Sequence, residues 1–253
     1  MITIKKPIDE VINEVSNNLN IEAETVKKLV KDVDKLSEKY IYVVSKDCIR
    51  CSLCYTECPV DAITKPTVRK PAEIIPDKCV KCEICAMTCP VNAIDVLNSS
   101  VNIDKDSVIY NLKEREIEHR TIKLKKYNID LENCIKCGIC ARYCPTNAIT
   151  VIRRESFEVD LNKCVGCKAC ENVCPKKVIN VENELGNIPF KKDIKVDNDL
   201  CVKCLTCIEE CPVGIISEIS EGVEIDKSNC IFCGKCESVC PVHAIKISSK
   251  KQE

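Results

Sequence analysis

The chain has 253 residues, and its 38 Lys and Arg nearly balance its 39 Asp and Glu. This balance gives no reason to expect a nucleic-acid partner, because phosphate binding needs a surplus of basic side chains on one face. Trp is absent and only 3 Phe are present, so the large aromatic side chains that usually dominate a core are scarce. The chain has 24 cysteines instead.

The first 39 residues contain no cysteine and have apolar residues at helical spacing. Pro7 suits a first helical turn, and Asn20 suits a cap between two helices. The apolar stripes are Ile8, Val11, Ile12, Val15 and Leu19, followed by Val26, Leu29, Val30, Val33, Leu36 and Tyr40. We therefore predict an N-terminal extension of two amphipathic helices, which either pack on the rest of the chain or form a docking element for a partner. Neither a signal-peptide pattern nor a long apolar run is present, so a cytoplasmic protein is expected.

Every cysteine belongs to one of six runs with one spacing, Cys-x2-Cys-x2-Cys-x3-Cys-Pro. The runs begin at Cys48, Cys79, Cys134, Cys164, Cys201 and Cys230, and they end at Cys58, Cys89, Cys144, Cys174, Cys211 and Cys240. This is the iron–sulfur ligation pattern of bacterial-type ferredoxins. Three closely spaced thiolates can wrap one face of a cubic cluster, so the fourth thiolate must come from elsewhere.

The distances between runs alternate between short and long, which groups the runs in pairs. We predict module 1 at residues 40–98, module 2 at 127–182 and module 3 at 194–248, with a linker at 183–193 and a tail at 249–253. Each half of a module has a strand, an Asp or Asn shortly before the first cysteine, the cysteine loop, a short helix and a second strand. The fold class is therefore α+β, with three tandem two-cluster modules.

Residues 99–126 form a charged insert without one clear hydrophobic period. It is either an added hairpin or a linker.

With these six runs, the chain from Tyr40 to Ile247 resembles the polyferredoxins, which are tandem arrays of the bacterial two-cluster ferredoxin unit. In that unit the fourth cysteine of a run ligates the other cluster. The resemblance implies six [4Fe-4S] clusters, with no thiol left over. Their ligand sets would be site 1, Cys48, Cys51, Cys54 and Cys89; site 2, Cys58, Cys79, Cys82 and Cys85; site 3, Cys134, Cys137, Cys140 and Cys174; site 4, Cys144, Cys164, Cys167 and Cys170; site 5, Cys201, Cys204, Cys207 and Cys240; and site 6, Cys211, Cys230, Cys233 and Cys236.

The resemblance also implies a function, which is one-electron transfer at low potential without catalytic residues of the chain's own. Polyferredoxins of methanogenic archaea accompany energy-converting hydrogenases, hydrogenase–heterodisulfide reductase systems and formylmethanofuran dehydrogenases. A six-cluster array of this size is most similar to those encoded with a membrane-bound hydrogenase. We therefore expect an anaerobic cytoplasmic carrier, peripheral to such a complex. A path that follows the chain would run through module 2, so that Cys137→Ser would interrupt transfer between the outer modules.

One alternative and one departure from the family pattern stay open at this point. Four thiolates also suit zinc, and a chain with six zinc sites would be a structural or assembly scaffold. The second open matter is the residue after the second cysteine of each run, which is often Gly in the family. Gly138 and Gly234 follow that pattern, whereas Ser52, Glu83, Lys168 and Leu205 depart from it.

Overall fold

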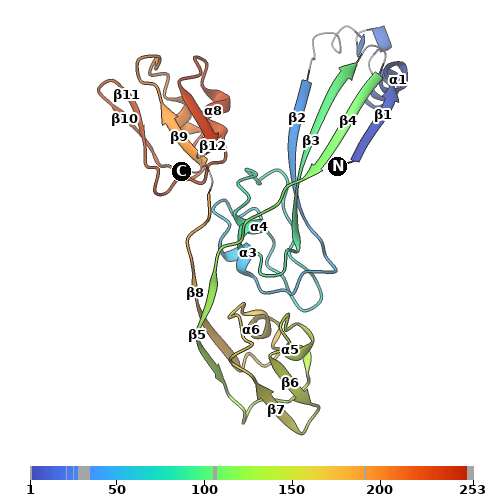
Figure 1. The fold of residues 1–253 in the computed structure, drawn as a ribbon, viewed down its shortest axis with the longest axis vertical. Coiled ribbons are helices and arrows are strands. Elements are labelled where there is room, and N and C mark those ends of the chain that lie inside the picture. The colour runs from blue at the N-terminus through green and yellow to red at the C-terminus, as the bar shows by residue number, and fades with distance from the viewer. Residues whose placement is uncertain are drawn as a thin grey trace. The chain divides into compact units, whose positions relative to one another are not determined.

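The computed structural model describes residues 2–20, 22–24, 26–27, 35–104, 107–190 and 192–249. The chain divides into two compact units (Figure 1). The N-terminal unit contains Met1–Tyr42 and Asp95–Ile117, and the cysteine-rich unit contains Val43–Ile94 and Glu118–Glu253. Both helices and strands are present, and no helix among the described residues has the length and apolar character needed to cross a bilayer.

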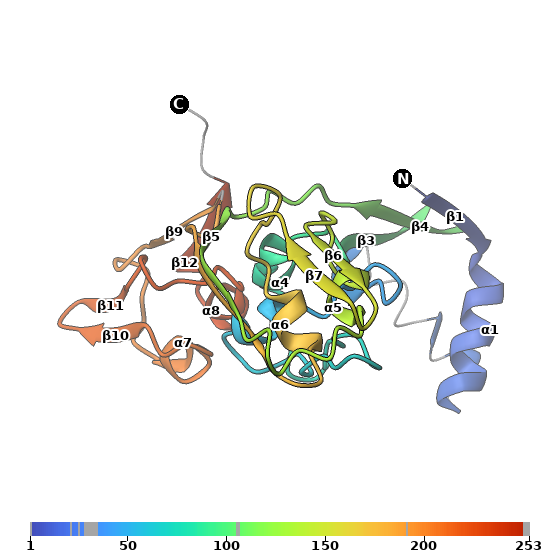
Figure 2. The ribbon, with the colours of Figure 1, turned by 90° about the horizontal axis from the view of Figure 1, so that it is seen from below.

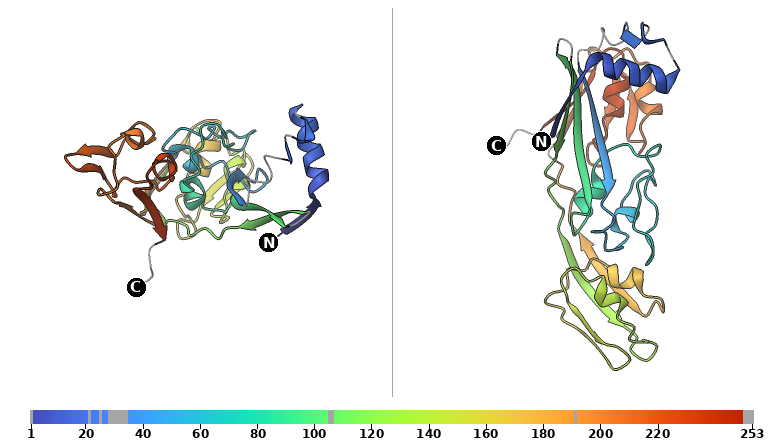
Figure 3. Two further views of the ribbon diagram at one scale, coloured as in Figure 1. Left: turned by 90° about the horizontal axis from the view of Figure 1, so that it is seen from above. Right: turned by 90° about the vertical axis from the view of Figure 1, so that its right-hand side faces the viewer.

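The N-terminal unit is built on a four-stranded sheet with the order β1-β4-β3-β2. Its elements are β1 (Ile2–Pro7), α1 (Ile8–Leu19), β2 (Lys35–Val43), β3 (Ile94–Asp104) and β4 (Ser107–Glu114). Strand β4 pairs antiparallel with both β1 and β3. Helix α1 contacts β1 and β4 (Figure 3). Ile12 is buried on this helix, whereas Asp9 and Glu14 are exposed.

The N-terminal helices predicted from the sequence are only partly present. Helix α1 coincides with the first of them, but the end of the second is wrong, because Lys35–Val43 is strand β2. The aromatic and β-branched residues Tyr40–Val43 favour a strand, and the Tyr42 hydroxyl donates a hydrogen bond of 3.0 Å to Asp95 on β3. Of the second apolar stripe, Leu29, Val30 and Val33 lie outside the described residues.

The insert between modules 1 and 2 contains a hairpin. Residues 99–104 complete β3 and residues 107–114 form β4, and the register pairs Ile103 with Val108. The remaining residues lead into β5 (Ile122–Ile129), which pairs antiparallel with β8 (Ile179–Leu185). These two segments of the insert thus belong to the N-terminal sheet, in which β4 lies between β1 and β3 and forms hydrogen bonds with both.

The cysteine-rich unit contains three pairs of short helices, two of which are accompanied by two-stranded sheets. The helices form contacting pairs, which are α3 (Leu53–Thr56) with α4 (Ile84–Thr88), α5 (Ile139–Arg142) with α6 (Ala169–Val173), and α7 (Thr206–Glu209) with α8 (Lys235–Val239). Beside α5 and α6, β6 (Ile149–Ile152) pairs with β7 (Ser156–Val159). Beside α7 and α8, β9 (Lys192–Val196) pairs with β12 (Ile245–Ser249), and β10 (Ile216–Ile219) pairs with β11 (Gly222–Ile225) (Figure 2).

A buried isoleucine follows every cysteine run at the same distance. The residue five positions after the fourth cysteine is at most 7% exposed in all six repeats, namely Ile63, Ile94, Ile149, Ile179, Ile216 and Ile245. Each of these isoleucines begins a strand or forms an isolated bridge, as Ile63 does with Ile74. The small apolar cores of the cysteine-rich unit are therefore built from these isoleucines and from the cysteines themselves.

Candidate iron–sulfur sites

All six cysteine loops have the same backbone conformation. The residue before the second cysteine and the residue after it both have positive φ. The first group is Arg50, Lys81, Lys136, Gly166, Lys203 and Phe232, and the second is Ser52, Glu83, Gly138, Lys168, Leu205 and Gly234. A left-handed residue turns successive peptide N–H groups towards one side of the chain, and such concave loops bind anions, including the sulfur of iron–sulfur sites.

This conformation explains the departures from glycine seen in the sequence. Ser52, Glu83 and Leu205 adopt φ values of 68°, 71° and 61°, close to the 80° of Gly138. A residue with a Cβ pays about 1–2 kcal/mol for this conformation. The six loops therefore share one shape, and the non-glycine residues carry strain that glycine would not.

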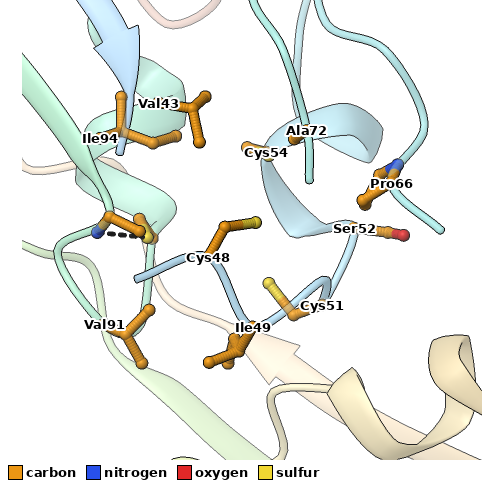
Figure 4. A pocket seen from close by; sticks show the side chains of 12 residues that line it. Val43, Cys48, Ile49, Cys51, Ser52, Cys54, Pro66, Ala72, Val91 and Ile94 are labelled. Carbon is orange, nitrogen blue, oxygen red and sulfur yellow. Dashed lines mark hydrogen bonds between the residues drawn. The ribbon is translucent and has the colours of Figure 1, made fainter. Parts of the chain in front are cut away.

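The thiols of four ligand sets each line a single cavity. The cysteines of sites 1, 3, 4 and 6 surround cavities of about 340, 350, 330 and 330 Å3 respectively. In site 1 the sulfur atoms of Cys48, Cys51 and Cys54 turn towards the same space, with Val43 and Ile94 nearby (Figure 4). In each of these sites the fourth cysteine comes from the other run of the same pair. The structure therefore brings together residues up to 41 positions apart, such as Cys48 and Cys89.

The thiols of the two remaining sets also lie near one another. In site 2 the thiols of Cys58 and Cys79 act electrostatically on Cys82, and in site 5 those of Cys204, Cys201 and Cys240 act on Cys207. Burial is the main reason why the pKa of Cys82 is raised to about 11.

The donor set and the cavities fit a cluster of several atoms. A zinc ion would draw four sulfurs to a point, because its bonds to sulfur are about 2.3 Å long. In sites 1, 3, 4 and 6 the four thiols instead surround a common space with mainly apolar walls. Among the described residues, no three His, Cys, Asp or Glu side chains are grouped so that they could hold one ion.

Backbone amides point at the fourth cysteine of four runs. The N–H of the residue four positions later donates to its Sγ at 3.2 or 3.3 Å, in the pairs Ala62 to Cys58, Ala93 to Cys89, Ala148 to Cys144 and Ala244 to Cys240. These alanines are at most 3% exposed. A signal for this bond is present in the sequence, since Ala-Ile follows at a fixed distance from Cys-Pro, but we did not predict it.

Eleven of the 24 thiols have a raised pKa, mainly because burial disfavours the thiolate. The third cysteine of every run is buried. Burial raises the pKa of Cys54 to about 12 and that of Cys140 to about 11. Cys204 is the single exposed cysteine, and hydrogen bonds from Thr206 lower its pKa. A cationic group must therefore stabilise the buried thiolates if they are to act as ligands.

Aspartates order the approach to the cysteine loops. Asp130, Asp160, Asp197 and Asp226 each accept a hydrogen bond from the backbone N–H two residues later, at 3.0 to 3.2 Å. Such local bonds favour a turn. They account for the Asp found shortly before the first cysteine of these runs.

Comparisons with known proteins agree with this geometry. One family model described as a 4Fe-4S dicluster domain matches residues 47–93, 78–148 and 163–215. Two further models with that description match residues 128–181 and 193–249. An uncharacterised polyferredoxin-like protein of Methanocaldococcus jannaschii is 51% identical over 152 residues, which are 60% of this chain and 59% of that protein. The match thus spans less than two thirds of the relative's length.

The dicluster model alone covers more than half of the chain, and domains of this kind transfer electrons through iron–sulfur clusters. The chain therefore belongs to the 4Fe-4S dicluster domain family and is a polyferredoxin.

Proposed function

We propose that the chain carries six [4Fe-4S] clusters, one in each of sites 1 to 6, and passes single electrons between redox partners. The observation that carries this proposal is the convergence of four cysteines on a common cavity in sites 1, 3, 4 and 6. All six cysteine loops have positive φ at the same two positions, which supports a [4Fe-4S] cluster in sites 2 and 5 as well.

We also propose that the six sites are grouped in three modules, at residues 40–98, 127–182 and 194–248. The helix contacts support this grouping, because α3 contacts α4, α5 contacts α6, and α7 contacts α8. Two apolar cores support it as well. One contains Cys140 and Cys170, and the other contains Cys207 and Cys236, so each core joins two runs.

When bound, each cluster supplies a one-electron couple whose potential depends on hydrogen bonds to sulfur and on solvent exclusion. The chain contributes both. The amides of Ala62 and Ala93 donate to Cys58 and Cys89, which stabilises negative charge on sulfur. The buried isoleucines after each run keep water from the apolar side of the sites.

The partner at one end of this carrier is a hydrogenase-type complex of an anaerobe. This step rests on the resemblance to methanogen polyferredoxins, together with a polyferredoxin-like relative from a methanogen. Helix α1 belongs to a unit that has no cysteine, and we assign this unit to docking on that complex.

The first test is iron and acid-labile sulfide analysis of anaerobically purified protein, with visible and EPR spectra before and after dithionite. About four irons and four sulfides for every four cysteines, with bleaching on reduction, is the expected result. Zinc without sulfide in protein kept free of oxygen would overturn the carrier function and indicate a structural scaffold.

The partner is tested separately by mixing the holo-protein with a purified energy-converting hydrogenase under hydrogen. We expect rapid bleaching that needs both proteins. A matched truncation without residues 1–39 retains all 24 cysteines and should bleach more slowly in this assay while keeping its response to dithionite. Equal rates for the two proteins would remove the docking assignment.

A further inference from the structure

Modules 1 and 2 meet directly at their cysteine loops. The side-chain amide of Asn172 donates hydrogen bonds to the main-chain oxygens of Arg50 at 2.7 Å and of Pro66 at 3.2 Å. Asn172 follows Cys170 of site 4 by two residues, and Arg50 lies between two cysteines of site 1. These bonds therefore join the cysteine loop that contributes to site 4 to the cysteine loop that contributes to site 1.

Two aromatic contacts extend this interface. The hydroxyl of Tyr143 donates a hydrogen bond of 2.9 Å to the main-chain oxygen of Val68, and the Arg50 guanidinium lies 5.1 Å from the centre of the Tyr143 ring. Tyr143 directly precedes Cys144, which belongs to site 4. The thiols of Cys51 and Cys167 are close enough to interact electrostatically. The interface thus brings together site 1 and site 4.

Modules 1 and 3 meet through an apolar cluster that includes cysteines of both. Cys82 and Ile84 of module 1 and Ile231 of module 3 are buried together, with Cys233 packed against them. Phe190, from the linker, stacks at a tilt on Phe232, with ring centroids 5.1 Å apart. Cys82 belongs to site 2, whereas Cys233 belongs to site 6, and their thiols interact electrostatically. This interface therefore brings together sites 2 and 6.

The segments that enter and leave module 2 form hydrogen bonds with module 1 and with each other. The side chain of Arg120, only 9% exposed, pairs with Glu57 at 2.6 Å and donates from Nε to the main-chain oxygen of Gly186 at 2.7 Å. Its backbone N–H bonds to Met87 on α4. The chain thus enters and leaves module 2 beside module 1. Module 1 therefore has contacts with both of the other modules.

The exposure of the residue after the first cysteine of each run indicates independently which two sites lie at the ends of the set of six. The residue after the first cysteine of the run is 8% exposed at Ile231 and 38% exposed at Val165, and it is half-buried at Ile49 and Val80. It is 52% exposed at Ile135 of site 3 and 59% exposed at Val202 of site 5. The loops of sites 3 and 5 therefore face solvent more than the other four.

From these contacts we propose that the sites form one electron path in the order 3, 4, 1, 2, 6, 5, with module 1 in the middle. The proposal rests on the proposed function, since it orders the clusters assigned there. It replaces the path expected from chain order, in which module 2 would lie between the outer modules. Electrons are exchanged with partners at sites 3 and 5.

The chain offers a native point for introducing electrons at one end. His243 is exposed and follows Cys240 of site 5 by three residues, whereas His119 is only half-exposed and its Nδ1 is buried. A ruthenium photosensitiser bound to the imidazole of His243 will reduce site 5 on illumination with a sacrificial amine donor. Samples of dilute holo-protein are frozen soon after illumination, before electrons pass between separate protein molecules. The number of reduced clusters is then measured by EPR and compared with that of a dithionite-reduced sample.

Two matched cysteine variants distinguish the paths. In Cys82→Ala, which removes a ligand of site 2, we expect rapid reduction of sites 5 and 6 only. In Cys137→Ala, at the far end of the path, we expect rapid reduction to reach every remaining site. A path in chain order predicts instead that Cys82→Ala leaves sites 3 and 4 rapidly reducible and that Cys137→Ala isolates sites 1 and 2. That result would overturn the proposed order.

A third variant changes the interface between modules 1 and 2 and keeps every cysteine, so that it tests the order even if the two cysteine variants misfold. Asn172→Leu should slow the reduction of sites 3 and 4 without changing the iron content, whereas Asn162→Leu, at an exposed position in the same module, should leave it unchanged. Unchanged transfer in Asn172→Leu together with rapid reduction of sites 3 and 4 in Cys82→Ala rejects the order. Absence of iron and sulfide from the wild-type protein would instead reject the proposed function.

Discussion

Asn172 and Arg50 are 122 positions apart in the chain, and the side-chain amide of Asn172 donates a hydrogen bond of 2.7 Å to the main-chain oxygen of Arg50. The bond ties a residue inside one cysteine run to a residue inside another. Its acceptor is available because Arg50 has φ of 59° and lies in an irregular loop, outside any helix or strand. The loop conformation that surrounds a cluster site thus also provides the contact between modules.

Two glycines of the cysteine loops that both have positive φ should differ in how much stability is lost when each is replaced by alanine. Gly138 and Gly166 have φ of 80° and 70°, but a Cβ at Gly138 meets nothing within 4 Å, whereas one at Gly166 comes within 3.0 Å of the Leu124 backbone. Gly138→Ala should lower stability by about 1 kcal/mol from backbone strain alone. Gly166→Ala should cost clearly more, because strand β5 would have to move. The measurement is the guanidinium midpoint for loss of visible absorption under argon, and equal midpoints would contradict the prediction.

The partly buried ion pair between Arg120 and Glu57 should contribute to stability. Arg120→Met leaves the carboxylate of Glu57 and the main-chain oxygen of Gly186 without their donor, at a cost of about 2 kcal/mol. Lys125→Met is the control, because Lys125 and Glu184 form an exposed pair at 3.4 Å that is worth at most about 1 kcal/mol. A double-mutant cycle with Glu57→Gln separates the pair from the rest; a coupling energy near zero would show that the pair does not stabilise the fold.

Tyr127 should raise the reduction potential of site 4. Its hydroxyl is buried and has no hydrogen-bond partner among the described residues, while burial and then the nearby Cys170 thiol raise the pKa of Tyr127. A buried O–H group beside a thiolate can turn its hydrogen towards the sulfur and so stabilise the more negative, reduced state. Tyr127→Phe should therefore lower one potential by tens of mV, on the order of 1 kcal/mol. An EPR redox titration measures it, with the exposed Tyr55→Phe as control; a matching shift in the control would refute the assignment.

Acid should remove the contribution of Asp226. Its carboxylate accepts bonds from the Ser228 N–H and hydroxyl and from the Asn229 amide, and these bonds lower its pKa. Because the folded pKa lies below the unfolded value of about 3.9, the stabilisation is complete above that pH and is lost as the pH falls through the folded pKa. The half-life of the visible absorption should be longer in wild type than in Asp226→Asn at neutral pH, and the difference should shrink in acid. A constant difference would contradict this role.

Site 5 should be the first to degrade in air. Cys204 is the only exposed cysteine of the chain, whereas Cys82, Cys85 and Cys89 are buried. Oxidation of a cluster follows access of oxygen to its sulfur ligands. After brief exposure to air, iodoacetamide should label the peptides with Cys201 and Cys204 before those with Cys82 and Cys85, as read by mass spectrometry. Labelling of all sites at one rate would show that access does not control the loss.

The sequence by itself determined the local chemistry of this protein. The spacing of each run fixes where its thiols lie, because three cysteines within seven residues can only line one loop, and the Cys-Pro that follows leads into a strand that begins at a buried isoleucine such as Ile149. The alternating distances between runs along the chain also predicted that the runs are grouped in pairs. Positive φ at residues such as Lys136 and Leu205 could not be foreseen, because neither side chain favours that conformation.

Only the tertiary structure decided how the parts are connected. A helical stripe and a strand can share the same apolar residues, and the sheet formed with β3 decided that Lys35–Val43 is a strand. The order of modules follows from contacts such as those of Asn172, Tyr143 and Ile231, which involve partners more than 70 positions away. Such contacts have no local sequence period, because each depends on which surfaces the linkers bring together. Chain order therefore suggested module 2 as the centre, whereas the packing gives that position to module 1.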